Sequence, residues 1–221
     1  YLRIYDTETG ALLHCEEVPQ AWITHVQFSP RTNKQLLYNH EWPSECGIRR
    51  VWLFDGKRHR RLRDATEGRS AGDWTSHETW DVNGTYVMYH GRYEAGSAFV
   101  GRVKPDGSSR AEVPLPRGWH RYGHFTVVDA ETLVSDGYYE EADDADSGHG
   151  EWICRVDLSW DRHSATWTPL CRSGSSWSTQ DAHPHPVSDH GARFVYFTSD
   201  ADGRRAVYRT ALYPDTESGP R

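Results

Sequence analysis

The chain has 221 residues, of which 36% are hydrophobic and 13% are aromatic, with ten Trp and twelve Tyr. This composition fits one large domain or two small ones with a core of large rings, and it favours strands and turns over helices. The net charge of −7 argues against nucleic acid as a partner, and the lack of a long apolar run argues against a transmembrane helix or a membrane partner.

The cysteines leave the compartment open. No CxxC pair exists among the four, so the sequence indicates neither a thiolate zinc cluster nor a thioredoxin-type motif. Buried free thiols are the simpler interpretation of Cys15, Cys46, Cys154 and Cys171, and the cytoplasm is our working expectation. The chain begins at Tyr1 without a Met, so we expect the natural start to be missing. The oligomeric state is left open.

A unit of two strands followed by a hairpin recurs along the chain. Each copy opens on a His, at intervals of roughly 50 residues, and a unit of this length with four strands is typical of a β-propeller blade. The four copies begin with THVQFSPRTNKQLLYNHE (24–41), SHETWDVNGTYVMYHGRY (76–93), GHFTVVDAETLVSDGYY (123–139) and AHPHPVSDHGARFVYFTSD (182–200).

We therefore predict an all-β fold, a β-propeller with about four and a half blades in residues 1–212. The opening segment YLRIYDTETGALL (1–13) is interpreted as the outer hairpin of a preceding blade, so we expect upstream blades to be absent from this sequence. Residues 139–150 are predicted to form an acidic, solvated loop, and residues 213–221 a C-terminal tail. No helix longer than two turns is expected.

The recurring histidines are the first candidates for a functional site. The innermost strand of each propeller blade lines the central channel, so a residue that recurs at the start of that strand should lie close to its counterparts. His25, His77, His124 and His183 occupy this position. The alternative is a histidine that only supports blade packing, and for His25 on its own this alternative is at least as good.

The segment STQDAHPHPVSD (178–189) favours a metal site. His183 and His185 are two residues apart, so on a strand both side chains would point to one face. Gln180 can bring an amide oxygen to the same point, and His124 of the adjacent blade would complete a set of three nitrogens and one oxygen. Imidazole suits zinc, copper, iron and nickel, and the amide oxygen also admits manganese.

Several segments together resemble the oligogalacturonate lyase family of seven-bladed propeller enzymes. They occur in the family's order over nearly the whole chain: THVQFSP, LLYNHEWP, RRVWLF, SHETWDVNG, GHFTVV followed by SDG, and QDAHPHP. The resemblance implies a manganese ion held by His124, Gln180, His183 and His185. It also implies that His77 is the catalytic base and that Arg50 binds the substrate carboxylate. The implied reaction is β-elimination of short, unsaturated oligogalacturonides in pectin degradation, with keto-deoxyuronate monosaccharides as products.

These residue types fit that chemistry. Elimination removes the proton at C5 of a uronate, and the charge that develops on the carboxylate must be neutralised, which a divalent metal and a bidentate Arg can do. A His is neutral near pH 7 and can accept the proton. On the residues alone, Arg49 is as good a candidate as Arg50.

Other polar residues leave alternatives open. His25, His40 and Glu41 are candidate substrate-binding residues, although the last two could instead cap a strand end. The run KRHRRLR (57–63) is interpreted as a solvated hairpin and not as a polyanion-binding patch. Two alternative functions remain, a propeller lyase for another uronate-containing glycan and a non-catalytic propeller that binds a protein or sugar.

Overall fold

The computed structural model describes residues 1–18, 22–41, 50–63, 74–93, 97–115, 119–121, 123–136, 138–139 and 152–214. Within these residues every regular element is a β-strand except the single 3-10 turn η2 (Gln180–Ala182), so the predicted all-β class is confirmed. No helix among them is long and apolar enough to span a membrane.

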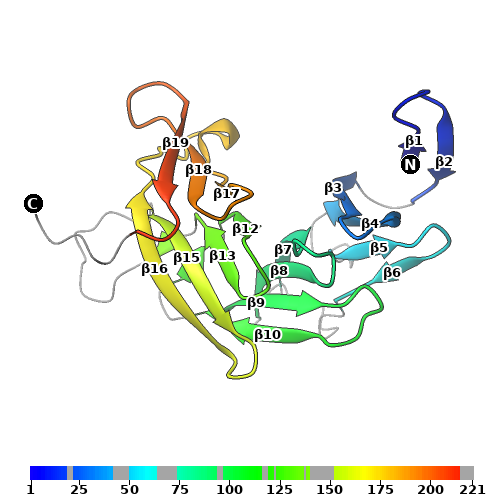
Figure 1. Cartoon of the computed structure of the whole chain (residues 1–221), viewed down its shortest axis with the longest axis horizontal. Coiled ribbons are helices and arrows are strands. Elements are labelled where there is room, and N and C mark those ends of the chain that lie inside the picture. Colours follow the sequence, from blue (N-terminus) through cyan, green and yellow to red (C-terminus); the bar gives the residue numbers. More distant parts are fainter. Residues whose placement is uncertain are drawn as a thin grey trace, which may run out of the picture.

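Four antiparallel sheets follow one another along the chain and form blades (Figure 1). Blade 1 contains β3 (Trp22–Ser29), β4 (Thr32–Glu41), β5 (Trp52–Phe54) and β6 (His59–Arg61). Blade 2 contains β7 (Trp74–Trp80), β8 (Val87–Arg92), β9 (Ala98–Val103) and β10 (Ala111–Pro114). Blade 3 contains β12 (Phe125–Val127), β13 (Thr132–Ser135), β15 (Trp152–Ser159) and β16 (Ser164–Arg172). Blade 4 contains three strands, β17 (Val187–Ser188), β18 (Phe194–Ser199) and β19 (Ala206–Ala211).

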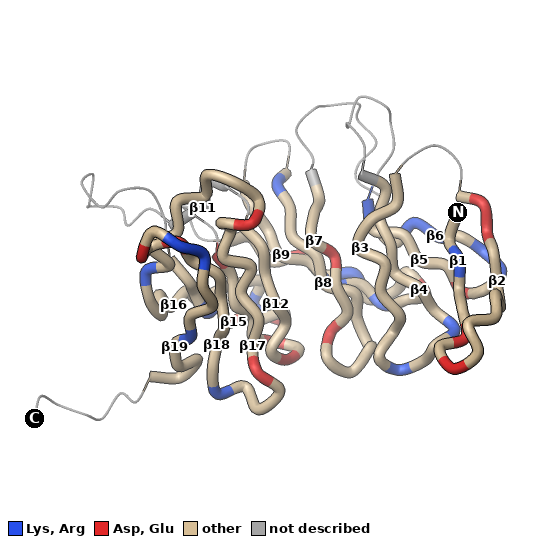
Figure 2. Tube along the Cα trace, turned by 90° about the horizontal axis from the view of Figure 1, so that it is seen from above, with Lys and Arg blue, Asp and Glu red and all other residues tan. Residues whose placement is uncertain are grey.

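The first strand of each blade is the innermost one. Strand β7 contacts β3 on one side and β12 on the other, and β12 contacts β17. The outer strands β6, β10 and β16 lie away from this row (Figure 1). In the view of Figure 2 the four blades stand side by side, with charged residues at many of the turns between strands. This is the propeller-like arrangement that the repeat predicts.

The hydrophobic core lies between the blades. Blades 1 and 2 meet through Leu37 and Leu53 on one side and Tyr89 and Phe99 on the other, all at most 2% exposed. Similar clusters join blade 2 to blade 3 around Met88 and blade 3 to blade 4. Because the residues of one face of each strand pack against the neighbouring blade, the alternating pattern of the sequence fixes the stacking of blades.

The hairpin of β1 (Leu2–Tyr5) and β2 (Leu12–Glu16) pairs with no other strand among the described residues. Its buried Leu2 packs against Leu36, Tyr38 and Phe54 of blade 1. It therefore contacts blade 1 as a neighbouring blade would, in line with the prediction that it is an outer hairpin. Two further short strands, β11 (Trp119–Arg121) and β14 (Tyr138–Tyr139), pair with each other. In the sequence β11 precedes β12, and β14 falls between β13 and β15 of blade 3.

Some predictions on loops are corrected or lie outside the described residues. The run 57–63 contains the second strand of the β5–β6 hairpin, but Arg63 is only 5% exposed, and its Nε lies 2.9 Å from Glu112 Oε1. His59 is half-buried, with its Nδ1 2.9 Å from the Tyr38 hydroxyl. The description of a solvated hairpin was therefore wrong for these two side chains. Cys46, most of the predicted acidic loop and residues 215–221 lie outside the described residues.

Candidate metal centre and cavity

The first two histidines of the row sit at irregularities in the innermost strands. The pairing register shifts between Thr24 and Gln27 in β3, and between Ser76 and Thr79 in β7. His25 and His77 lie within these shifts with φ of 52° and 50°, a conformation that few residues other than glycine adopt. A β-bulge re-aims the side chain at that point. We predicted these histidines at the strand start, and the structure has them inside the strand at a bulge.

The histidines nevertheless lie in one row along the inner strands. The ring centroids of His25 and His77 are 5.8 Å apart, those of His77 and His124 are 4.7 Å apart, and those of His124 and His183 are 5.4 Å apart. Residues about 50 positions apart in the sequence thus contact one another because each occupies the same place in its blade.

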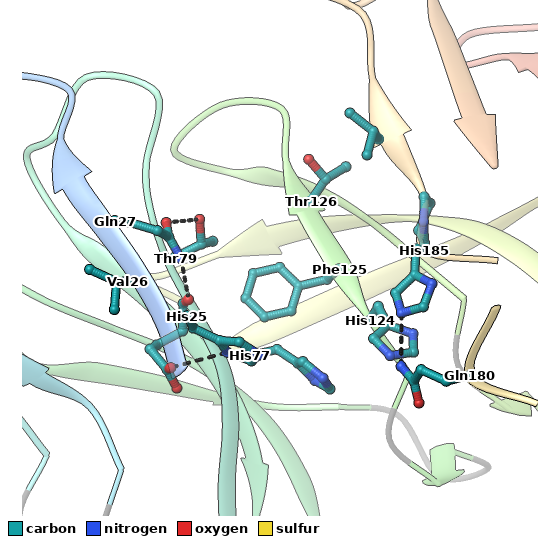
Figure 3. A pocket seen from close by; sticks show the side chains of 13 residues that line it. His25, Val26, Gln27, His77, Thr79, His124, Phe125, Thr126, Gln180 and His185 are labelled. Atoms are coloured by element: carbon teal, nitrogen blue, oxygen red, sulfur yellow. Dashed lines mark hydrogen bonds and ion pairs between the residues drawn. The ribbon is translucent and has the colours of Figure 1, made fainter. Parts of the chain in front are cut away.

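His124, His183 and His185 form a tight group that could hold a metal ion. Each offers one ring nitrogen, and these nitrogens all lie within 4.8 Å of one another. The side-chain amide nitrogen of Gln180 lies 3.3 Å from His185 Nε2. Rotation of this amide by about 180° would place its oxygen, which can ligate a metal, at the same point. Figure 3 shows Gln180 beside His124 and His185.

The local backbone that brings His183 and His185 together differs from our prediction. Both residues precede β17, whereas we expected them on one face of a strand. The turn η2 ends as the His183 N–H donates to the Gln180 carbonyl at 3.2 Å, and His185 has a φ of 45°. Between them, the Pro184 carbonyl accepts a hydrogen bond from Thr198 N at 2.8 Å. The turn and the left-handed residue therefore set the geometry, in place of strand pleating.

Asp136 holds His124 and His185 in place through hydrogen bonds. The sequence alone did not indicate this residue. Its carboxylate has no exposed surface and accepts hydrogen bonds from His124 Nδ1 and from the backbone N–H of His185, both at 2.9 Å. It also accepts the backbone N–H of His124. A carboxylate on Nδ1 fixes the tautomer and leaves Nε2 as the ligand atom, as in many metal sites.

The contact between His124 and Asp136 in blade 3 has equivalents in blades 1 and 2. In each blade a polar side chain at the end of the second strand, or just after it, meets Nδ1 of the inner histidine. Asn39 Nδ2 lies 3.2 Å from His25 Nδ1, His90 Nε2 lies 2.9 Å from His77 Nδ1, and Asp136 Oδ2 lies 2.9 Å from His124 Nδ1. The signal in the sequence is the aligned position of Asn39, His90 and Asp136 in YNHE, YHGR and SDGY.

A cavity of about 400 Å³ runs along the row, a size that suits a small ligand. Figure 3 shows His25, His77, His124 and His185 around it. Phe125, Val26 and Val187 add apolar surface between the polar groups. The remaining lining residues are Gln27, Glu78, Thr79, Thr126, Gln180 and Pro186.

Neither Arg50 nor His40 is among the residues that line the cavity, but Arg50 lies against the lining residue Glu78. The Arg50 side chain is 15% exposed, and its Nε is 3.6 Å from Glu78 Oε2. His40 is 6% exposed and packs edge-on against the Tyr38 and Trp52 rings at 5.5 and 5.4 Å. The candidate role of His40 in substrate binding therefore finds no support in this geometry. Arg49 and the side chain of Glu41 lie outside the described residues.

Burial lowers the pKa of His77, His90, His183 and His185 and so favours their neutral form. It lowers the pKa of His77 far below the usual range, and the nearby His90, His124 and Arg50 add to the effect. The pKa of His90 falls to about 3, mainly through burial. The pKa values of His183 and His185 are also lowered by burial and by His124. Neutral imidazoles are the form that ligates a metal or accepts a proton.

The residues present fit a bound divalent cation. His183 Nδ1 is buried and has no hydrogen-bond partner among the described residues, which is costly unless another group meets it. Together with the two neighbouring imidazoles and the Gln180 amide, it forms a set of nitrogen and oxygen donors suited to a first-row divalent metal.

Comparison with known families agrees with this geometry. A family model described as oligogalacturonate lyase matches residues 2–216. The chain belongs to the oligogalacturonate lyase family. It is 26% identical over 210 residues to an oligogalacturonate lyase of Dickeya dadantii strain 3937, covering 88% of this chain and 51% of that protein.

Two solved structures of oligogalacturonate lyases share the fold. One, from Vibrio parahaemolyticus, has a TM-score of 0.74 and 25% identity over 97% of this chain and 55% of that one. The other was solved in complex with manganese and has a TM-score of 0.69 and 22% identity, covering 88% of this chain and 49% of that one. The chain therefore spans about half the length of the relatives that it matches.

Proposed function

We propose that this chain carries the metal site and the catalytic base of a lyase that cleaves short oligogalacturonides by β-elimination. The observation that supports it most is the relation of His77 to the three-histidine group. His77 lies against His124, with ring centroids 4.7 Å apart, but does not belong to the group His124, His183 and His185. A base must lie near the metal without being bound to it, because ligation would occupy the lone pair that accepts the proton.

The proposed metal is Mn²⁺, held by His124, Gln180, His183 and His185. The family membership and the related lyase solved in complex with manganese support this choice. When bound, such a cation supplies Lewis-acid neutralisation of the charge that develops on the uronate carboxylate.

The remaining steps use side chains of this chain. His77 takes the proton from C5, the bond between C4 and its oxygen breaks, and a double bond forms between C4 and C5. The leaving oxygen takes up a proton. Arg50 binds the carboxylate next to C5, for which a guanidinium offers a planar pair of donors. Burial supports the neutral form of His77, because it lowers the pKa of this side chain.

His25 is proposed to contact the substrate at the far end of the cavity from the metal group, since it lines the cavity and its side chain is 37% exposed. His40 is left out of the proposed site because it is buried against Trp52. A substrate that is already short suits an enzyme acting in the cytoplasm, which we keep as part of the proposal.

The test combines metal analysis with product analysis. The full-length protein is expected to contain a stoichiometric divalent metal and to convert digalacturonate and unsaturated digalacturonate. Elimination adds no water, so mass spectrometry should show products lighter by one water than those of hydrolysis. Preference for another member of a panel of uronate disaccharides would favour the alternative lyase. A protein that contains no bound metal and converts none of these substrates would favour the alternative of a non-catalytic propeller.

A further inference from the structure

We propose that Glu78 is a positioning residue, which holds Arg50 for the substrate carboxylate and His25 at the far end of the cavity. This inference rests on the proposed function and deepens it. It assigns the buried group that sets the geometry of the carboxylate clamp, by which we mean the Arg50 guanidinium that binds the substrate carboxylate. Glu78 follows the proposed base His77 directly on β7 of blade 2. Its three partners all come from blade 1.

The contacts of the Glu78 carboxylate are closely defined. Oε1 accepts a hydrogen bond from Asn39 Nδ2 at 2.6 Å and lies 3.2 Å from His25 Nδ1. Oε2 lies 3.6 Å from Arg50 Nε. Asn39 is itself fixed, since its amide oxygen accepts the Thr24 hydroxyl at 2.6 Å. The carboxylate thus connects one proposed clamp residue with one cavity-lining histidine.

Burial makes this arrangement rigid. The Glu78 side chain has no exposed surface and Asn39 is fully buried, so neither can exchange its partners for water. A buried carboxylate is tolerated only while it is paired and hydrogen-bonded. Asn39 therefore cannot leave Glu78 without a large cost. The ion pair between Glu78 Oε2 and Arg50 Nε, which at 3.6 Å is longer than a hydrogen bond, restricts the rotamers that Arg50 would otherwise sample.

The joint between blades 1 and 2 has other supports. The Glu78 backbone carbonyl accepts Gln27 Nε2 at 3.0 Å, and the Thr79 hydroxyl donates to Gln27 Oε1 at 3.0 Å. The apolar cluster around Leu37 and Phe99 also joins the two blades. Since these contacts do not involve the Glu78 carboxylate, its charge is not required to hold the blades together, and a role toward Arg50 and His25 accounts for it.

The test is a double-mutant cycle in the full-length enzyme with Glu78→Gln and Arg50→Ala. The substitution Glu78→Gln keeps shape and removes the charge. We expect it to lower kcat/KM for unsaturated digalacturonate by about 10–100-fold, chiefly through KM, because the clamp loses its orientation. In the Arg50→Ala background the same change should cost less than about threefold, because no clamp remains to be positioned.

The matched control is Glu112→Gln. Glu112 is also a largely buried carboxylate paired with an arginine, Arg63, and it does not line the cavity. This variant should lose thermal stability and keep kcat/KM. If Glu78→Gln fails to fold, Asn39→Ala replaces it, since this change removes the 2.6 Å hydrogen bond to Glu78 and should show the same dependence on Arg50.

The outcomes separate the two hypotheses. If Glu78→Gln lowers kcat/KM equally with and without Arg50, and also lowers Tm, the positioning role is overturned. The lyase proposal stands in that case, provided that the wild-type protein is active. If the wild-type protein neither cleaves unsaturated digalacturonate nor binds galacturonate in calorimetry, the proposed function fails and the role of Glu78 fails with it.

Discussion

Replacing Asp136 by Asn tests the metal centre without touching a proposed ligand. The wild-type carboxylate is fully buried and accepts three N–H groups, from His124 Nδ1, His124 N and His185 N. An asparagine of the same shape has one accepting oxygen and one donating amide. At least one of the three N–H groups would then face another donor inside the protein.

The size of the effect follows from these contacts. Loss of the group that orients a metal-binding histidine typically weakens metal affinity by about 10–100-fold, which corresponds to roughly 1.4–2.7 kcal/mol. A buried N–H left without an acceptor destabilises the metal-free protein by about 1–3 kcal/mol as well. We therefore expect Asp136→Asn to bind Mn²⁺ more weakly than the wild type and to melt at a lower temperature after chelation.

Calorimetric titration of the metal-free protein with Mn²⁺ measures the affinity, and thermal melts with and without chelator measure stability. The matched control is Asp81→Asn. Asp81 is 2% exposed, its Oδ1 accepts hydrogen bonds from Thr85 N and Tyr86 N, and it does not line the cavity. It should change stability only. An unchanged Mn²⁺ affinity in Asp136→Asn would refute the reasoning that this carboxylate orients His124.

Three further predictions concern single histidines. His183→Ala should lose bound metal and turnover together, as measured by elemental analysis and product assay, and retention of the metal would remove this residue from the ligand set. His77→Ala should lower kcat by about two to four orders of magnitude with near-normal metal content; near-normal turnover would show that it is not the base. Because the pKa of His90 is lowered to about 3, the unfolded chain binds a proton there below pH 6.5 while the folded chain does not. The free energy of unfolding should thus decrease as the pH is lowered, by about 2 kcal/mol at pH 5, as measured by urea unfolding of the metal-free protein. His90→Gln should abolish that part of the loss.

The blades and the histidine row could be predicted because their signals are local and repeated. Each blade is one contiguous stretch of alternating residues and turns, and the same pattern returns about every 50 residues. Once the repeat was aligned, the common position of His25, His77 and His124 followed, and so did their proximity in space. The HxH segment likewise indicated the group with His124, although the turn that shapes it was not foreseen.

The second-strand partners could not be predicted with the same ease. Whether Asn39 or His40 faces the inner strand depends on the register of β3 against β4, and a one-residue shift exchanges the two faces. The bulge at His25 changes that register. The sequence therefore offers His40 as a substrate-binding candidate, whereas in the structure His40 is buried against Trp52 and its neighbour Asn39 contacts Glu78. Glu78 was missed because its partners lie in another blade.

The same fold position thus carries histidines whose surroundings differ in charge. Asp136 is an anionic partner, which favours a histidine that donates from Nδ1 and binds a cation through Nε2. His90 is a buried, uncharged partner, which keeps His77 neutral and suits a proton acceptor. Asn39 is a neutral amide that also binds the carboxylate of Glu78. Three histidines at corresponding places in their blades thus have partners of different charge. Their backbones also differ, because His25 and His77 lie at bulges with positive φ, whereas His124 directly precedes β12.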